Sequence, residues 1–82
     1  MRLFLKTKIL NELNKIFCEY FDDETIVLKE NTTANDIDEW DSLAQVGLVL
    51  IIEKKFSLRF SSSEIENLPN IGSMVDLIDA KQ

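Results

Sequence analysis

The spacing of apolar residues is the feature that most constrains this chain, because it follows the helical period in three segments and nowhere alternates as a strand requires. The first stripe predicts a helix over about residues 3–21, and its members are Ile9, Leu10, Leu13, Ile16, Phe17, Tyr20 and Phe21. A second helix should run from Leu43 to about Phe56 and is apolar nearly all round. Such a helix is either buried on several sides or keeps an apolar face for partners.

Capping residues predict where two further helices begin. Residues 61–63, all serine, followed by Glu64 have the capping-box spacing of a short third helix that ends before Pro69. Asn70 can cap a fourth helix. The apolar stripe of that helix consists of Ile71, Met74, Val75 and Ile78. The predicted fold is therefore all-α: a four-helix bundle with three longer helices, a short third helix and a long loop between helices 1 and 2.

The loop of residues 25–41 is long for a compact domain, and loops of this length are usually functional or disordered. It is rich in Asn, Thr and Asp. We expect it to be ordered because four apolar side chains can anchor it to the core. These are Ile26, Val27, Leu28 and Ile37.

Length and composition limit the classes of function that this chain can have. The 82 residues provide one small domain, residues 1–82. The one cysteine, Cys18, allows no internal disulfide, which fits a reducing compartment, and its helical surroundings favour a small buried hydrophobe over a reactive thiol. The longest apolar run, residues 46–52, is too short to span a bilayer, so we expect a soluble, cytoplasmic protein. The lack of histidine argues against Ser-His and Cys-His catalytic pairs and most zinc or iron sites.

The negative charge is concentrated in one segment. The formal net charge is −6, and residues 22–41 alone carry eight acidic side chains and one basic side chain. This distribution argues against nucleic acid and anionic membranes as partners, and for proteins with basic docking surfaces. We expect the chain to act as a monomer.

Two aspartates in this acidic segment resemble the start of a calcium-binding loop. Asp36 and Asp38 match its first and third positions. However, Trp40, Asp41 and Gly47 stand where the loop needs an oxygen ligand, a glycine and a glutamate. No metal site is predicted.

Ser42 precedes the apolar second helix directly, and two interpretations of it are open. Asp41 or Ser42 can be the N-cap of that helix, and Ser42 with Gln45 has capping-box spacing. The Ser42 hydroxyl can also be an attachment point, because helix N-terminal N–H groups and the positive end of the helix dipole favour a phosphate there. The two roles are compatible.

The order of these elements and four motifs resemble the acyl carrier protein family over nearly the whole chain. The motifs are Asp41-Ser42-Leu43, IEKKFSLRF at residues 52–60, SEIE at residues 63–66 and IGSMVDLI at residues 71–78. The resemblance implies that Ser42 carries 4'-phosphopantetheine, installed from coenzyme A by a separate phosphopantetheinyl transferase (holo-ACP synthase). The protein would then hold acyl groups as thioesters and have no catalytic activity of its own. The other implied partners are acyl-loading and acyl-using enzymes such as ligases, ketosynthases or acyltransferases.

The resemblance also implies a docking surface next to the serine. Leu43, Val46 and Leu50 match positions that family members present to partner enzymes, although apolar residues at helical spacing are more often core. Glu53 matches an acidic recognition position. Asp41 would orient the region or contact the transferase, or it merely caps the helix.

Several residues depart from the family pattern. Ala44, Gly47 and Lys54 stand where housekeeping fatty-acid carriers have acids, and Trp40 stands near a common glycine. Gly47 either permits close approach of a partner or is a tolerated surface glycine. The negative charge instead precedes the serine, in Asp36, Asp38, Glu39 and Asp41. We therefore expect a specialised carrier in a fatty-acid, polyketide or related acyl-transfer pathway.

The place of the acyl chain and the class of cargo stay open at this point. An acyl chain can enter a slot between the second, third and fourth helices, but the same residues can simply be packed core. They are Val49, Ile52, Phe56, Ile65, Leu68, Met74, Val75 and Ile78. The alternative functions are a peptidyl or aminoacyl carrier, and an acidic helical interaction module in which Ser42 is only a cap.

Overall fold

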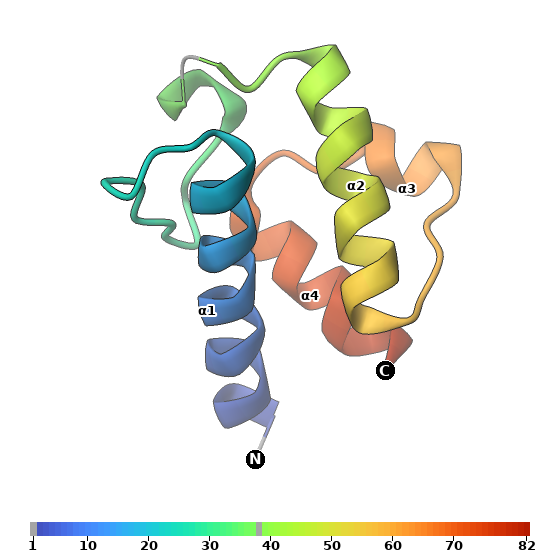
Figure 1. The fold of residues 1–82 in the computed structure, drawn as a ribbon. Coiled ribbons are helices and arrows are strands. Elements are labelled where there is room, and N and C mark those ends of the chain that lie inside the picture. The colour runs from blue at the N-terminus through green and yellow to red at the C-terminus, as the bar shows by residue number, and fades with distance from the viewer. Residues whose placement is uncertain (1, 38) are drawn as a thin grey trace.

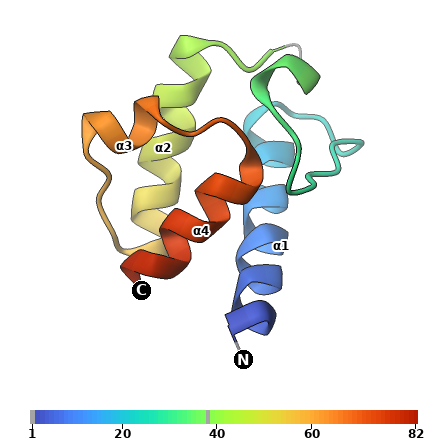
Figure 2. The ribbon, with the colours of Figure 1, turned by 180° about the vertical axis from the view of Figure 1, so that it is seen from behind.

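The computed structural model describes residues 2–37 and 39–82, with side chains from Leu5 onward, so Asp38 of the predicted acidic segment lies outside the described residues. The elements are α1 (Arg2–Tyr20), the 3-10 turn η1 (Ala34–Asp36), α2 (Ser42–Phe56), α3 (Ser62–Glu66) and α4 (Ile71–Lys81). The described residues form no strand, and the predicted all-α fold of four helices with a short third one is confirmed. In Figure 1, α1 and α2 run in opposite directions, and the long loop lies over the C-terminal end of α1. In Figure 2, seen from the opposite side, α4 crosses in front of this pair, and α3 lies beside α2.

The core is built from one face each of α1, α2 and α4. The fully buried side chains are Leu13 and Phe17 of α1, Leu48 and Ile52 of α2, and Ile71, Met74 and Ile78 of α4. The stripe predicted for α4 is buried as expected, and the stripe of α1 is buried up to Phe17 except for the half-buried Leu10. Tyr20 was expected in this stripe but is 38% exposed, because its ring lies over Gly47 at the surface of α2.

The loop between α1 and α2 is held to α1 by a side chain that the sequence pattern did not single out. The Asn14 side-chain oxygen accepts a hydrogen bond from the Leu28 N–H at 2.6 Å. Its amide group donates to the Ile26 carbonyl at 3.2 Å. Cys18 is only half-buried, and its thiol donates to the same carbonyl at 3.4 Å. Backbone groups of the loop are thus satisfied by α1, as an ordered loop requires.

The loop is also joined to the start of α4. The N–H groups of Ile71 and Gly72, which have no partner inside their own helix, donate to the carbonyls of Thr32 and Glu30 at 2.8 Å each. A side chain at Gly72 would place its Cβ 3.0 Å from the Glu30 carbonyl oxygen, so glycine allows this close approach.

One of the four predicted loop anchors was wrong. Leu28 is buried, and Ile26 and Ile37 pack against the core, but Val27 is 71% exposed. Successive side chains in an extended segment point to opposite sides, so burial of Ile26 and Leu28 turns Val27 outward.

Candidate modification site

Ser42 is the first residue of α2, and its side chain is exposed. The N-cap is Asp41, whose Oδ1 accepts a hydrogen bond from the Ala44 N–H at 2.8 Å. Of the two caps that the sequence left open, Asp41 is therefore the one that occupies the position, and Ser42 is not the cap. The Ser42 hydroxyl makes no hydrogen bond to any described residue. Capping by Asp41 leaves this hydroxyl free at the positive end of the helix dipole.

The predicted capping box of Ser42 and Gln45 is replaced by a different contact. The Trp40 indole N–H donates to the Gln45 side-chain oxygen at 2.6 Å, and the Trp40 ring stands edge-on to Phe17 with 5.0 Å between ring centroids. Trp40 therefore fastens the residues before Ser42 both to α2 and to the core. The common glycine near this position is replaced by a residue that fixes the loop through packing.

A surface pocket of about 350 Å³ lies beside Ser42. Its lining comes from the end of the long loop, the start of α2 and the segment around α3: Ala34, Trp40, Asp41, Ser42, Gln45, Ile65, Leu68 and Pro69. Two members of the predicted acyl slot, Ile65 and Leu68, thus lie next to Ser42. Other members of that set, including Ile52 and Ile78, are fully buried in the core. Nothing in the sequence spacing indicated the pocket, because it depends on how α3 docks beside α2.

Three of the five predicted partner-binding residues form an exposed apolar face on α2. Leu43, Val46 and Leu50 are 79%, 59% and 61% exposed, and their spacing places them on one side of the helix. Ile51, which sequence reasoning did not assign to this face, is 40% exposed. The all-round apolar character of α2 therefore has two sources, a buried face and a face left in solvent, with Ser42 at its N-terminal end.

The other two predicted partner-binding residues, Asp41 and Glu53, make contacts within the chain. Asp41 is the cap described above. The half-buried Glu53 accepts a hydrogen bond from the Phe60 N–H at 2.8 Å, which holds the segment between α2 and α3. The positions alone gave no sign that Glu53 would be engaged in this way.

Gly47 supports close packing inside the chain. A Cβ at this position would lie 2.5 Å from the Tyr20 hydroxyl oxygen and 2.8 Å from its Cε1. Real Cβ atoms do not approach so closely, so the Tyr20 ring can lie over α2 as it does only with glycine here, and a larger residue would displace it. Of the two interpretations left open for Gly47, neither included this contact with Tyr20.

The chemistry around Ser42 suits a group that is attached by another protein. Among residues 2–37 and 39–82, no three Asp, Glu or Cys side chains are grouped to hold a metal ion. The chain has no histidine, and the adjacent carboxylate of Asp41 is engaged by the Ala44 N–H. A phosphodiester fits this position, since the hydroxyl is exposed, the helix dipole favours a negative charge and a pocket lies alongside. Fold and site together fit the class of small helical proteins that carry a covalently attached group.

Comparisons with known proteins agree with this class. The family model described as "Phosphopantetheine attachment site" matches residues 11–78. An acyl carrier protein of Acidothermus cellulolyticus is 36% identical over 74 residues, which span 89% of this chain and 87% of the relative. The solution structure of holo acyl carrier protein from Geobacter metallireducens is 43% identical with a TM-score of 0.83, covering 88% of this chain and 83% of that one.

The chain therefore belongs to the acyl carrier protein family. Covalent phosphopantetheine is the cofactor of this family, and its members are carriers that depend on a transferase and on acyl-handling enzymes for all chemistry. The predicted cofactor, the predicted carrier role and the predicted general classes of partner enzyme are therefore confirmed for the family to which this chain belongs. In the described part of the chain, no helix has the length and apolar character to cross a membrane.

Proposed function

We propose that Ser42 is the residue that receives 4'-phosphopantetheine. The observation that supports this most is its free hydroxyl at the first position of α2, inside the segment matched by the family model. In the proposed reaction, the Ser42 oxygen forms a bond to the pantetheine-bearing phosphorus of coenzyme A. The bond from that phosphorus to the departing 3',5'-ADP breaks, and the hydroxyl proton passes to a base of the transferase.

The experiment is intact-mass measurement after incubating the apo protein with coenzyme A and a promiscuous phosphopantetheinyl transferase. We expect a gain of one phosphopantetheinyl group, and no gain for Ser42→Ala. Ser62→Ala is a matched control, because Ser62 is also an exposed first residue of a helix that follows a capping residue. Modification that persists in Ser42→Ala would remove Ser42 from the proposal.

We further propose that partner enzymes dock on the exposed face of Leu43, Val46 and Leu50. Exposed apolar residues next to the attachment point support this, since an isolated domain gains nothing from leaving them in water. Leu50→Ser should lower the kcat/KM of the transferase about tenfold, which is typical of an interface hot spot. Leu5→Ser, 47% exposed on α1, should leave it unchanged. Equal effects of the two changes would refute this docking face.

The finer part of the proposal is a specialised acyl carrier in the cytoplasm that serves a fatty-acid, polyketide or related pathway. Its support is the pattern of charge around Ser42. Lys54 and Gly47 stand where acids are common in housekeeping carriers, and Gly47 packs against Tyr20. The exposed acids Glu39 and Asp41 instead precede the serine. The free Cys18 supports a reducing compartment. Loading of the holo protein by a panel of acyl and aminoacyl ligases, read as thioester mass, tests the cargo. Aminoacyl loading alone would contradict an acyl carrier.

A further inference from the structure

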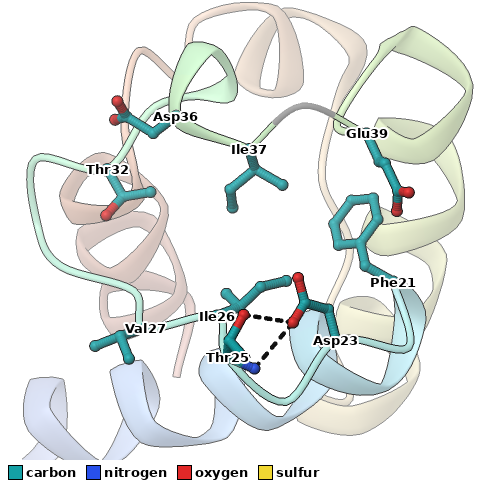
Figure 3. Close-up of a pocket in the computed structure, with 9 residues that line it drawn as sticks. All are labelled: Phe21, Asp23, Thr25, Ile26, Val27, Thr32, Asp36, Ile37 and Glu39. Carbon is teal, nitrogen blue, oxygen red and sulfur yellow. Dashed lines mark hydrogen bonds between the residues drawn. The ribbon is translucent and has the colours of Figure 1, made fainter.

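A groove of about 410 Å³ lies between the end of α1 and the loop that leads to α2, away from the exposed face of α2. Figure 3 shows Ile37 on one wall pointing toward Ile26 on the other. Phe21, Asp23 and Glu39 line the same groove, and Figure 3 draws the Phe21 ring between the two acidic side chains. The carrier function described above uses only the negative charge of the acidic residues in this groove and none of its apolar side chains.

The groove carries negative charge, and no ion pair joins its acidic residues to a Lys or Arg among the residues that the structure describes. Three acidic residues line it, Asp23, Asp36 and Glu39, and no Lys or Arg does, although the Asp36 carboxylate accepts hydrogen bonds from the N–H and hydroxyl of Thr33. The Glu39 carboxylate has no hydrogen-bond or ion-pair partner among the described residues. Hydrogen bonds from the side chain and then the backbone N–H of Thr25 lower the pKa of Asp23, so this carboxylate stays ionised at neutral pH.

The lining of the groove fits an organic cation better than a metal ion. The carboxylates of the described residues do not come together in a group of three that could hold a metal. Between them lie the apolar side chains of Ile26 and Ile37 and the ring of Phe21, which an alkyl chain can cover. The Phe21 ring is held in place by Phe17 and Tyr20, with centroids 6.0 and 5.2 Å away. A planar guanidinium stacks on such a ring and pairs with carboxylates at its edge.

We propose that this groove is an interaction surface that receives one arginine side chain of a partner protein. The guanidinium lies on Phe21 between Asp23 and Glu39, and the alkyl stem lies along Ile26 and Ile37. Glu39 is three residues from Ser42, so the two sites are at most about 11 Å apart along the chain. One partner can therefore contact the groove and the attachment site together. The inference does not depend on modification of Ser42.

The test is an NMR titration of the apo protein with n-propylguanidinium, which reproduces the arginine side chain. We expect amide shifts at residues 21–27, 36, 37 and 39 and none across α2 and α4, with half-saturation on the order of 10 mM. Methylguanidinium, which lacks the stem, and butyrate, which has the wrong charge, should bind at least several-fold more weakly. Glu39→Gln should raise the half-saturation concentration at least threefold, whereas Glu66→Gln, an exposed acid on α3, should not change it.

Four outcomes would overturn the proposal. Shifts spread over the whole acidic surface would indicate non-specific attraction, and equal binding of methylguanidinium would remove the role of the apolar walls. Stronger and equally localised shifts with MgCl2 would indicate a cation site. An unchanged Glu39→Gln titration would show that the guanidinium binds elsewhere. Each result holds whether or not Ser42 proves to be the attachment residue.

Discussion

Asp41 offers the sharpest test of how this chain presents its serine. Its Oδ1 accepts the Ala44 N–H at 2.8 Å, and the Ala44 side chain beyond that N–H is buried. Replacing an N-cap Asp by Ala costs about 1 kcal/mol, within a range of about 0.5–2 kcal/mol. Asn at the same position retains the acceptor and loses only the charge at the helix dipole, which contributes about 0.3–1 kcal/mol. We therefore expect Asp41→Ala to be the more destabilising change.

The measurement is urea unfolding followed by far-UV circular dichroism. With a slope of about 1 kcal/mol per M for so small a domain, Asp41→Ala should lower the unfolding midpoint by about 1 M. Asp41→Asn should lower it by a smaller amount, because the hydrogen-bond acceptor is kept. Equal midpoints for the two variants would refute the capping argument.

The same variants separate the two roles predicted for Asp41. Because its carboxylate is engaged by the Ala44 N–H, we expect the transferase to modify Asp41→Asn within about twofold of the wild-type rate. A large loss of rate in Asp41→Asn, with stability retained, would show instead that the transferase needs the charge.

Three further predictions concern the side-chain contacts of Gly47, Trp40 and Glu64. Gly47→Ala should not stabilise the protein, despite a helix-propensity gain of about 1 kcal/mol, because its methyl group would collide with Tyr20. In a Tyr20→Ala background the same change should stabilise the protein by about that amount. Additive free energies of unfolding in this double-mutant cycle would contradict the packing argument. Trp40→Phe should cost about 1 kcal/mol through loss of its hydrogen bond to α2, and Trp40→Ala clearly more, as thermal unfolding can check. The N–H of Ser61 and then a lysine of α4 lower the pKa of Glu64 below its usual value of 4.5, so the unfolded state takes up the proton first. Stability should fall as the pH drops from about 5, and Glu64→Gln should lose less stability over that range than the wild type.

The sequence by itself determined the helices and where they begin. The caps Ser61 and Asn70 were recognisable because a capping side chain bonds to backbone groups two or three residues away, a purely local interaction. The motif around Ser42 likewise placed the candidate attachment residue at the start of α2, although it did not decide between Asp41 and Ser42 as the cap. The buried stripes followed from spacing alone, since one helical period fixes which residues share a face.

The tertiary structure decided what spacing cannot encode, namely which side chains meet across distant segments. Gly47 is opposite Tyr20, Asn14 binds the long loop, and Glu53 holds the segment after α2. The family resemblance had assigned Leu43, Val46 and Leu50 to a surface face, but the apolar spacing of α2 alone could not tell this face from the one buried in the core. The pocket beside Ser42 exists because α3 docks there. These features depend on contacts between residues far apart in the chain, whereas helix formation and capping are local.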